Sequence, residues 1–284
     1  MPTRSVLPGV VIDQRAWPAS GGGFADVFKV IYKGRNVAVK RLRFFAYPPS
    51  KEAELDGALC KEAIIWKHLE HPFVLPFMGV CILDPETGFK STVSPWCDLG
   101  NLGRHLAGNK PLDVGKTLLQ IAMGIEYLHS QNVVHGDISG NNVLLTDNLD
   151  VQICDFGLGK WQETSIVTGG SRATPGTVRY TAPELHRGER PTYASDVYAF
   201  ACLALEICTR KVPFSGTETM GVASRVCRGD RPPCPEEILD QRLWDLIEEC
   251  WSHQPDERPS TARVVATIQG WGVYLPECGS VSQE

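Results

Sequence analysis

Short runs of apolar and β-branched residues, separated by polar turns, predict a small β-sheet in the first third of the chain. The runs cover residues 10–12, 27–32, 37–42, 73–83 and 91–96. The polar segment 33–36 is typical of a hairpin turn between the second and third runs. One helix interrupts these strands, because apolar residues recur at helical spacing and form one face. They are Leu55, Leu59, Ala63, Trp66 and Leu69.

After residue 100 the pattern changes mainly to helices. Residues 112–129 predict an amphipathic helix, and a second helix that begins near Asp196 runs apolar through Leu205, which indicates burial on all sides. Short apolar runs between these helices are typical of buried strands. They cover residues 133–134, 143–145 and 151–153. With 284 residues, 43% of them hydrophobic, the chain can form one large domain or two small lobes.

Three polar side chains stand at the ends of the short strands: Asp137, Asn142 and Asp155. A hairpin through residues 147–150 would bring Asn142 back beside Asp155. Carboxylate and amide oxygens that converge in this way can hold Mg²⁺, which keeps substrate phosphates among its other ligands. A single Asp or Asn is more often a turn residue that ends a strand. The metal-site hypothesis therefore depends on the whole stretch.

The stretch of residues 133–157 resembles the catalytic loop of protein kinases, His-Arg-Asp-Leu-x-x-x-Asn, followed by their Asp-Phe-Gly metal motif. In this chain the loop is His-Gly-Asp-Ile-Ser-Gly-Asn-Asn at residues 135–142, and Asp-Phe-Gly follows at residues 155–157. The chain thus resembles a eukaryotic protein kinase catalytic domain of the serine/threonine type, in the tyrosine-kinase-like group.

This resemblance implies an α+β fold with two lobes in a kinase domain at residues 1–270. The small lobe, about residues 1–94, would contain an antiparallel β-sheet and one helix. A hinge is expected at residues 95–97, followed by a larger, mainly α-helical lobe at about residues 98–270 and a short tail at residues 271–284. The resemblance implies that ATP lies in the cleft at the hinge.

A glycine-rich stretch at residues 20–27 has the sequence Ser-Gly-Gly-Gly-Phe-Ala-Asp-Val. It lacks the Gly-Lys-Ser/Thr of a Walker loop, and a strand rather than a helix follows it, which argues against a Rossmann turn. It resembles the kinase loop whose backbone amides cover the phosphates of ATP. Ser20 and Ala25 replace the first and third glycines of the family's pattern, which puts the affinity for nucleotide in question.

Val-Ala-Val-Lys at residues 37–40 resembles the third-strand motif of kinases. A lysine in an apolar strand either extends to solvent at an edge or needs a partner, because an unpaired buried charge is costly to desolvate. Glu62 lies on the apolar face of the predicted helix and needs a cation in turn. We therefore expect a Lys40–Glu62 ion pair, which in kinases aligns the α- and β-phosphates.

The resemblance implies catalytic roles for Asp137, Lys40, Asn142 and Asp155. Asp137 would accept or orient the proton of the substrate hydroxyl, and Asn142 and Asp155 would bind Mg²⁺.

Nucleotide-binding residues are also carried over from the resemblance. Ser94 aligns with the residue before the hinge, and the backbone of Pro95 and Cys97 is expected to meet the adenine edge. The whole implied set is Ser20, Gly21, Gly22, Gly23, Ala25, Val27, Ala38, Lys40, Glu62, Ser94, Pro95, Cys97 and Leu144.

Later blocks extend the resemblance. Residues 176–184 resemble the Gly-Thr-x-x-Tyr-x-Ala-Pro-Glu block that closes the kinase activation segment, with Thr177 where serine/threonine kinases bond the catalytic aspartate. Arg258 is expected to form a buried bidentate pair with Glu184. The resemblance also places the Asp196 carboxylate on the backbone of the catalytic loop.

Two departures affect the predicted activity. Gly136 replaces the arginine that in most kinases balances a phosphorylated activation loop, so the chain is predicted to be a non-RD kinase that does not require this phosphorylation. Ser139 replaces the lysine that reaches the γ-phosphate. The predicted function is transfer of the γ-phosphate of Mg-ATP to Ser/Thr hydroxyls of proteins in signalling. The alternatives are a dual-specificity kinase and a weak or inactive pseudokinase that acts as a nucleotide-binding scaffold.

Composition narrows the expected setting. A net charge of −5 gives no basic footprint for nucleic acid or anionic lipid. Ten cysteines without a C-x-x-C pair, and an amino terminus without an apolar leader, favour free thiols in a reducing compartment. We expect a cytoplasmic protein without a membrane span. Its expected partners are ATP, a protein substrate and an unknown regulatory partner, but no nucleic acid.

Overall fold

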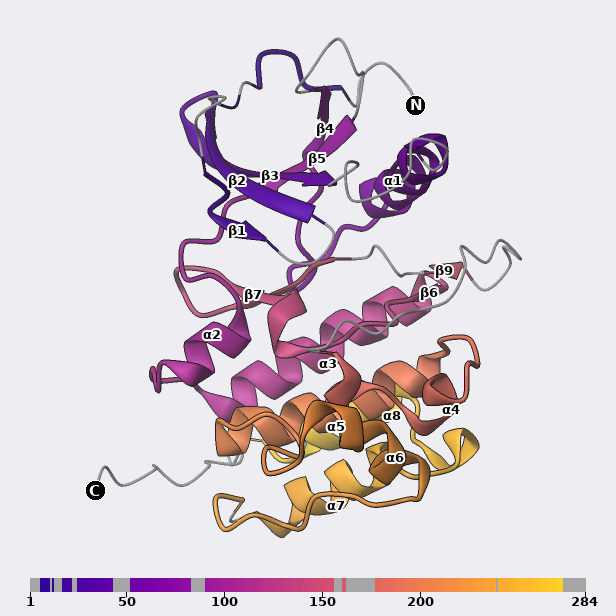
Figure 1. Cartoon of the computed structure of the whole chain (residues 1–284). Helices are drawn as coiled ribbons and strands as arrows, with labels where there is room; N and C mark the ends of the chain where they lie inside the picture. Colours follow the sequence, from indigo (N-terminus) through magenta and orange to yellow (C-terminus); the bar gives the residue numbers. More distant parts are fainter. Residues whose placement is uncertain are drawn as a thin grey trace. The chain divides into compact units, whose positions relative to one another are not determined.

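The computed structural model of the chain describes residues 6–10, 12, 17–21, 25–42, 52–82, 90–155, 160–161, 177–238 and 240–272. The chain divides into two units, Met1–Cys97 and Asp98–Glu284. Figure 1 shows a sheet with one helix in the first unit and most of the helices in the second. Among the described residues, no helix has both the length and the apolar character that crossing a membrane requires.

A five-stranded antiparallel sheet forms the first unit, with the strand order β1-β2-β3-β5-β4. Its strands are β1 (Ser20–Gly21), β2 (Ala25–Tyr32), β3 (Arg35–Leu42), β4 (Gly79–Ile82) and β5 (Lys90–Pro95), and helix α1 (Glu52–Lys67) comes between β3 and β4 in the chain. Lys33 and Gly34, which both have positive φ, form the predicted turn between β2 and β3. The predicted fold class of a small antiparallel sheet with one helix is confirmed here.

Alternation along β3 separates the core of this unit from its candidate site. Val37 and Val39 are buried in an apolar cluster that includes Tyr32 and Val93. Successive side chains of a strand point to opposite faces, so Ala38 and Lys40, both half-buried, lie on the other face. The predicted apolar face of α1 is confirmed where its side chains are described, since Leu59, Ala63 and Trp66 are buried.

The predicted strand over residues 73–83 is too long. The fourth strand begins only at Gly79. Pro76 has no amide proton to donate to a neighbouring strand, and the carbonyl of Leu75 accepts a hydrogen bond from the indole of Trp66. These two residues therefore cannot continue the ladder.

The predicted strand at residues 10–12 is wrong for the two of its residues that the structure describes. Val10 and Ile12 lie outside any strand, and Val11 is outside the described residues. The chain turns at Gly9, whose φ is 79°. Val6, before this turn, forms a parallel bridge to β4 instead.

Helices dominate the second unit. In chain order its elements are α2 (Leu102–Ala107), α3 (Val114–Ser130), β6 (Val133–Val134), η4 (Gly140–Asn142), β7 (Val143–Leu145), β8 (Val151–Ile153), β9 (Lys160–Trp161), η6 (Val178–Tyr180), α4 (Pro183–His186), α5 (Tyr193–Thr209), α6 (Thr219–Cys227), α7 (Gln241–Cys250), η7 (Pro255–Glu257) and α8 (Thr261–Gly270). The three short strands β6, β7 and β8 lie where the apolar runs predict them, and β7 pairs with β8. The predicted helical lobe is confirmed.

Helix α5 is the central element of this unit. It begins with a capping box between Thr192 and Ser195. Every residue from Ser195 to Thr209 is buried, and the apolar pattern predicts this burial as far as Leu205. It packs against α3, α7 and η6, and α3 packs in turn against α8 and β8 (Figure 1). The amino-terminal end of α5 therefore lies close to the short strands that carry the candidate site.

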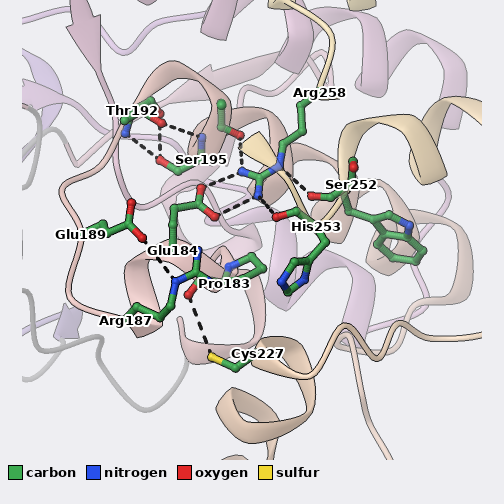
Figure 2. A network of polar contacts seen from close by, with 12 residues as sticks. Pro183, Glu184, Arg187, Glu189, Thr192, Ser195, Cys227, Ser252, His253 and Arg258 are labelled. Atoms are coloured by element: carbon green, nitrogen blue, oxygen red, sulfur yellow. Dashed lines mark hydrogen bonds and ion pairs between the residues drawn. The ribbon is translucent and has the colours of Figure 1, made fainter. Parts of the chain in front are cut away.

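The predicted Glu184–Arg258 pair is confirmed (Figure 2). The two guanidinium nitrogens Nη1 and Nη2 of Arg258 donate to the two carboxylate oxygens of Glu184 at 2.7 and 2.9 Å, and both side chains are almost fully buried. Arg258 also donates to the backbone carbonyls of Ala194, Ser252 and His253. This single arginine thus connects α4, the start of α5 and the segment before α8.

We predict that Glu184→Gln lowers the free energy of unfolding by about 3 kcal/mol or more, because it leaves the Arg258 charge buried without its carboxylate. Urea titration monitored by Trp fluorescence measures the change. Glu189→Gln is the matched control, since Glu189 and its partner Arg187 are exposed and such pairs contribute about 0–1 kcal/mol. Equal losses in the two variants would contradict the prediction.

Candidate active site

The β7–β8 hairpin brings the predicted metal ligands together. Val143 pairs with Ile153 across the two strands. One residue further, the amide of Cys154 donates to the carbonyl of Asn142 at 2.9 Å, so Asp155 follows directly beside Asn142. The expectation that the hairpin returns Asn142 to Asp155 is therefore confirmed.

Asn142 is bonded to the loop that carries Asp137. Its Nδ2 donates both to the backbone carbonyl and to the Oδ2 carboxylate oxygen of Asp137, each at 2.8 Å. The side-chain amide of Asn142 thereby fixes the orientation of the Asp137 carboxylate. The Oδ1 atom of Asn142 takes no part in these two bonds and is an acceptor. Asn142 is buried, whereas Asp137 is half-buried.

The backbone before Asp137 is held by Asp196, at the start of α5. The amides of His135 and Gly136 donate to the two carboxylate oxygens of Asp196, at 2.9 and 2.8 Å. His129 adds a third contact, from Nε2 at 2.9 Å. The predicted contact between Asp196 and the loop backbone is confirmed. Gly136 has a φ of 76°, in the left-handed region that glycine adopts without strain.

His135 is a buried core residue, and it also links two parts of the site. Its ring Nδ1 accepts from the amide of Asp137 at 3.2 Å, so its Nε2 carries the proton and donates to the carbonyl of Cys154 at 3.0 Å. Complete burial lowers the pKa of His135, although the charge of Asp196 opposes this shift. A neutral, internally bonded imidazole fits a positioning role.

The oxygen donors suit a hard divalent cation. The Asp155 carboxylate is half-buried at the end of β8, and the Oδ1 of Asn142 is an amide oxygen. Mg²⁺ is usually bound by one or two such protein groups together with phosphates and water. In the described part of the chain, no group of three or more His, Cys, Asp or Glu side chains could hold a metal ion.

A small pocket lies beside Asp137 in the second unit. Its walls come from three segments: the loop before β7, the residues around η6 and α4, and the start of α5. The lining residues are Gly136, Asp137, Ile138, Thr177, Tyr180, Thr181, Leu185, Ser195, Asp196 and Ala199. Thr177, which the sequence assigns to this region, therefore shares a pocket with Asp137.

Glu206 supports this pocket and was not predicted from the sequence. The hydroxyl of Tyr180 donates to its Oε2 at 2.7 Å, and the same oxygen lies 3.0 Å from where a Cβ on Gly140 would stand. Burial raises the pKa of Glu206, while the Tyr180 bond acts in the opposite direction. A carboxylate in the apolar run of α5 was the available sequence signal.

The first unit carries the predicted Lys40 and Glu62. Their Nζ and Oε1 atoms are 4.0 Å apart, with side-chain exposures of 25% and 14%. The predicted ion pair is present, at a distance too long for a hydrogen bond. Lys40 lies opposite Val27 of β2 on one side and opposite Thr92 of β5 on the other.

Further predicted nucleotide-binding residues lie on the same sheet. Ala38 pairs with Ser94 across β3 and β5, and Pro95 ends β5. Ser20 and Gly21 form β1, which pairs with the start of β2. The remaining members are Ala25 (buried), Val27 and Cys97 (half-buried), Leu144 (half-buried, in β7 of the second unit), and Gly22 and Gly23, which lie outside the described residues. Their roles remain predictions.

Ser139, at the position of the family's lysine, is completely buried. Its Oγ atom has no hydrogen-bond partner among the residues that the structure describes. This side chain lies in the interior of the second unit, where a lysine side chain could not be accommodated without a change in the loop.

Comparison with known proteins agrees with this geometry. Residues 19–268 match the family model of the protein tyrosine and serine/threonine kinases, so the chain belongs to this family. The sequence motifs predict that the chain is a eukaryotic protein kinase domain, and the family match confirms this prediction. Members of the family use ATP and a divalent metal ion.

Several curated kinases are similar to this chain. A serine/threonine/tyrosine-protein kinase of Arabidopsis thaliana is 31% identical over 264 residues, which are 91% of this chain and 66% of that protein. A dual specificity protein kinase of Dictyostelium discoideum is 32% identical over 252 residues, 87% of this chain and 49% of that protein. A serine/threonine-protein kinase of Arabidopsis thaliana is 28% identical over 252 residues, 87% of this chain and 42% of that protein. This chain therefore spans less than two thirds of these relatives.

We predict that Glu206→Gln becomes more stable relative to the wild type as the pH rises from 5 to 8. The pKa of Glu206 is raised in the folded chain, so the wild type loses stability as the pH rises above the carboxyl's unfolded value. Glutamine stays neutral and can still accept from Tyr180. Urea titrations at pH 5, 6.5 and 8 measure the difference, and a difference that does not change with pH would contradict the assignment.

Proposed function

We propose that this chain transfers the γ-phosphate of Mg-ATP to Ser and Thr hydroxyls of protein substrates in a signalling pathway. The observation that carries this proposal is the bonded pair of Asp137 and Asn142 beside Asp155, held in place by the Asp196 carboxylate. Phosphoryl transfer needs little covalent chemistry from the protein, and it depends on positioning and on charge stabilisation. This site provides fixed oxygen ligands and a fixed carboxylate.

Asp137 is the proposed proton acceptor. Its Oδ2 accepts from Asn142, and Oδ1 is the oxygen that we propose accepts the proton of the substrate hydroxyl. The pocket that Asp137 shares with Thr177 gives such a hydroxyl a place to bind. A Mg²⁺ ion held by Asn142 and Asp155 would neutralise charge on the phosphates.

The first unit supplies the proposed nucleotide contacts. Lys40, aligned by Glu62, would bind the α- and β-phosphates, while the backbone of β1, β2 and the residues from Pro95 to Cys97 would bind the remainder of ATP. Ser20 and Ala25 are both small, which is compatible with a loop that lies close to phosphate groups.

Two features bear on regulation and hydroxyl class. Gly136 has no side chain to pair with a phosphorylated loop, which supports activity that does not require such phosphorylation. Thr177 and the block around it favour Ser/Thr transfer. The names of two relatives, a serine/threonine/tyrosine kinase and a dual specificity kinase, keep dual specificity as the second candidate. A cytoplasmic location and a regulatory partner are further proposals.

We predict that the wild-type chain, given Mg²⁺ and ATP labelled on the γ-phosphate, labels itself and casein on Ser or Thr. Asp137→Asn should lower kcat at least about 100-fold, as expected for loss of a general base. Labelled residues are identified by mass spectrometry. Treatment with a phosphatase beforehand should leave the wild-type rate unchanged, because Gly136 cannot bind a loop phosphate.

Asp147→Asn is the matched control, because Asp147 is exposed in the β7–β8 turn and should keep the wild-type rate. Label on tyrosine as well would favour dual specificity. If the wild-type chain labels neither itself nor casein, the result contradicts the proposed kinase activity and favours the nucleotide-binding scaffold.

A further inference from the structure

The guanidinium group of Arg179, in η6, binds the loop between α5 and α6. Its Nη1 donates to the carbonyl oxygens of Pro213 and Phe214, at 2.9 and 2.7 Å. Its Nη2 donates to the carbonyl oxygen of Thr217 at 2.9 Å, with a longer contact of 3.4 Å to the hydroxyl of Thr219. Hydrogen bonds from a charged donor are stronger than those from neutral donors. One half-buried side chain therefore fastens η6 to a distant loop.

The loop that receives Arg179 is itself held from the other side. Arg225 of α6 donates from Nη1 to the hydroxyl of Thr217 at 2.8 Å, and its guanidinium lies 5.5 Å from the ring centroid of Phe214. Arg225 is oriented in turn by Asp230, at 3.3 Å. Because Thr217 is bound both at its carbonyl and at its hydroxyl, the loop is a fixed point of attachment for Arg179.

Arg179 stands between two residues that line the pocket beside Asp137. Thr177 and Tyr180 both belong to that lining. The carbonyl of Thr177 accepts from the amide of Tyr180 and from the hydroxyl of Thr181, each at 3.0 Å, so hydrogen bonds join the residues on both sides of Arg179. A shift of the Arg179 backbone would therefore move the wall that faces Asp137.

We infer that Arg179 is a positioning residue that sets the protein-substrate side of the pocket beside Asp137. This inference rests on the proposed kinase function. In most kinases an arginine directly before the catalytic aspartate pairs with a phosphorylated activation loop. In this chain Gly136 stands at that position. Arg179 replaces that pairing with bonds to backbone carbonyls, which are present whether or not any hydroxyl is phosphorylated. The hydroxyl-bearing segment of a protein substrate is the ligand class that this wall receives.

The test compares Arg179→Gln and Arg179→Lys with the wild type, using casein and ATP as substrates. Arg179→Gln should raise the KM for casein about tenfold or more, as expected for the loss of charged hydrogen bonds, and leave the KM for ATP within about twofold. Arg179→Lys keeps the charge but lacks the second nitrogen, so it should raise the casein KM by a smaller factor. A general loss of folded protein would not raise the casein KM more in Arg179→Gln than in Arg179→Lys, and it would not spare the KM for ATP.

Arg187→Gln is the matched control, because Arg187 lies in the same region but is exposed and pairs with the exposed Glu189. It should leave both KM values unchanged. A casein KM that stays at the wild-type value in Arg179→Gln, or an equal rise in both KM values, would overturn the inference while leaving the proposed function intact.

Hydrogen exchange separates this inference from failure of the proposed function. In Arg179→Gln, the amides of Tyr180 and Thr181, which donate to Thr177 and Val178, should exchange faster relative to those of α5. This result is expected even if the wild-type chain transfers no phosphate, an outcome that contradicts the proposed function. Unchanged exchange at these two amides would overturn the anchoring role itself.

Discussion

The position of the loop around Asp137 depends on the buried carboxylate of Asp196. This group accepts hydrogen bonds from two consecutive backbone amides, at His135 and Gly136, and it has a third contact with His129. A buried charge is tolerated only when its hydrogen-bonding capacity is satisfied. The Asp196 carboxylate therefore depends on the two loop amides, and the position of the loop depends on the carboxylate. Because Asp196 belongs to helix α5, in which every residue from Ser195 to Thr209 is buried, the loop before Asp137 is positioned by the central helix of the second unit.

From Asp196, hydrogen bonds connect the loop to the other parts of the candidate site in the second unit. His135 joins the loop to the residue before Asp155, Asn142 joins Asp137 to the β7–β8 hairpin, and Tyr180 joins the opposite wall to Glu206 on the same α5. Electrostatic catalysis needs groups that do not reorganise during the reaction. In this unit, helix α5 holds the site in place through two acidic side chains. Asp196 accepts hydrogen bonds from the loop before Asp137, and Glu206 accepts one from Tyr180 in the wall of the pocket.

Much of the fold could be predicted because apolar runs are local signals, and much of the site could be predicted because the chain resembles kinase motifs. Apolar runs of two to six residues marked β6, β7, β8 and most of the first sheet, and the resemblance to kinase motifs marked Asp137, Asn142, Asp155 and the Glu184–Arg258 pair. The start of β4 was predicted too early, because the apolar run does not show that the carbonyl of Leu75 is bonded to the indole of Trp66. Glu206 and Arg179 were not predicted because the kinase motifs assign them no role, and an apolar run does not show which partner a polar side chain meets 26 or 34 residues away.

The central claim is that the Asp196 carboxylate holds the loop before Asp137. Amide hydrogen exchange at His135 and Gly136 tests it most directly. We expect both amides to be protected in the wild type, and to exchange at least about tenfold faster in Asp196→Asn relative to the amides of β7 and β8, which report loss of the hairpin. Equal rates in the two proteins at His135 and Gly136, after this correction, would contradict the account.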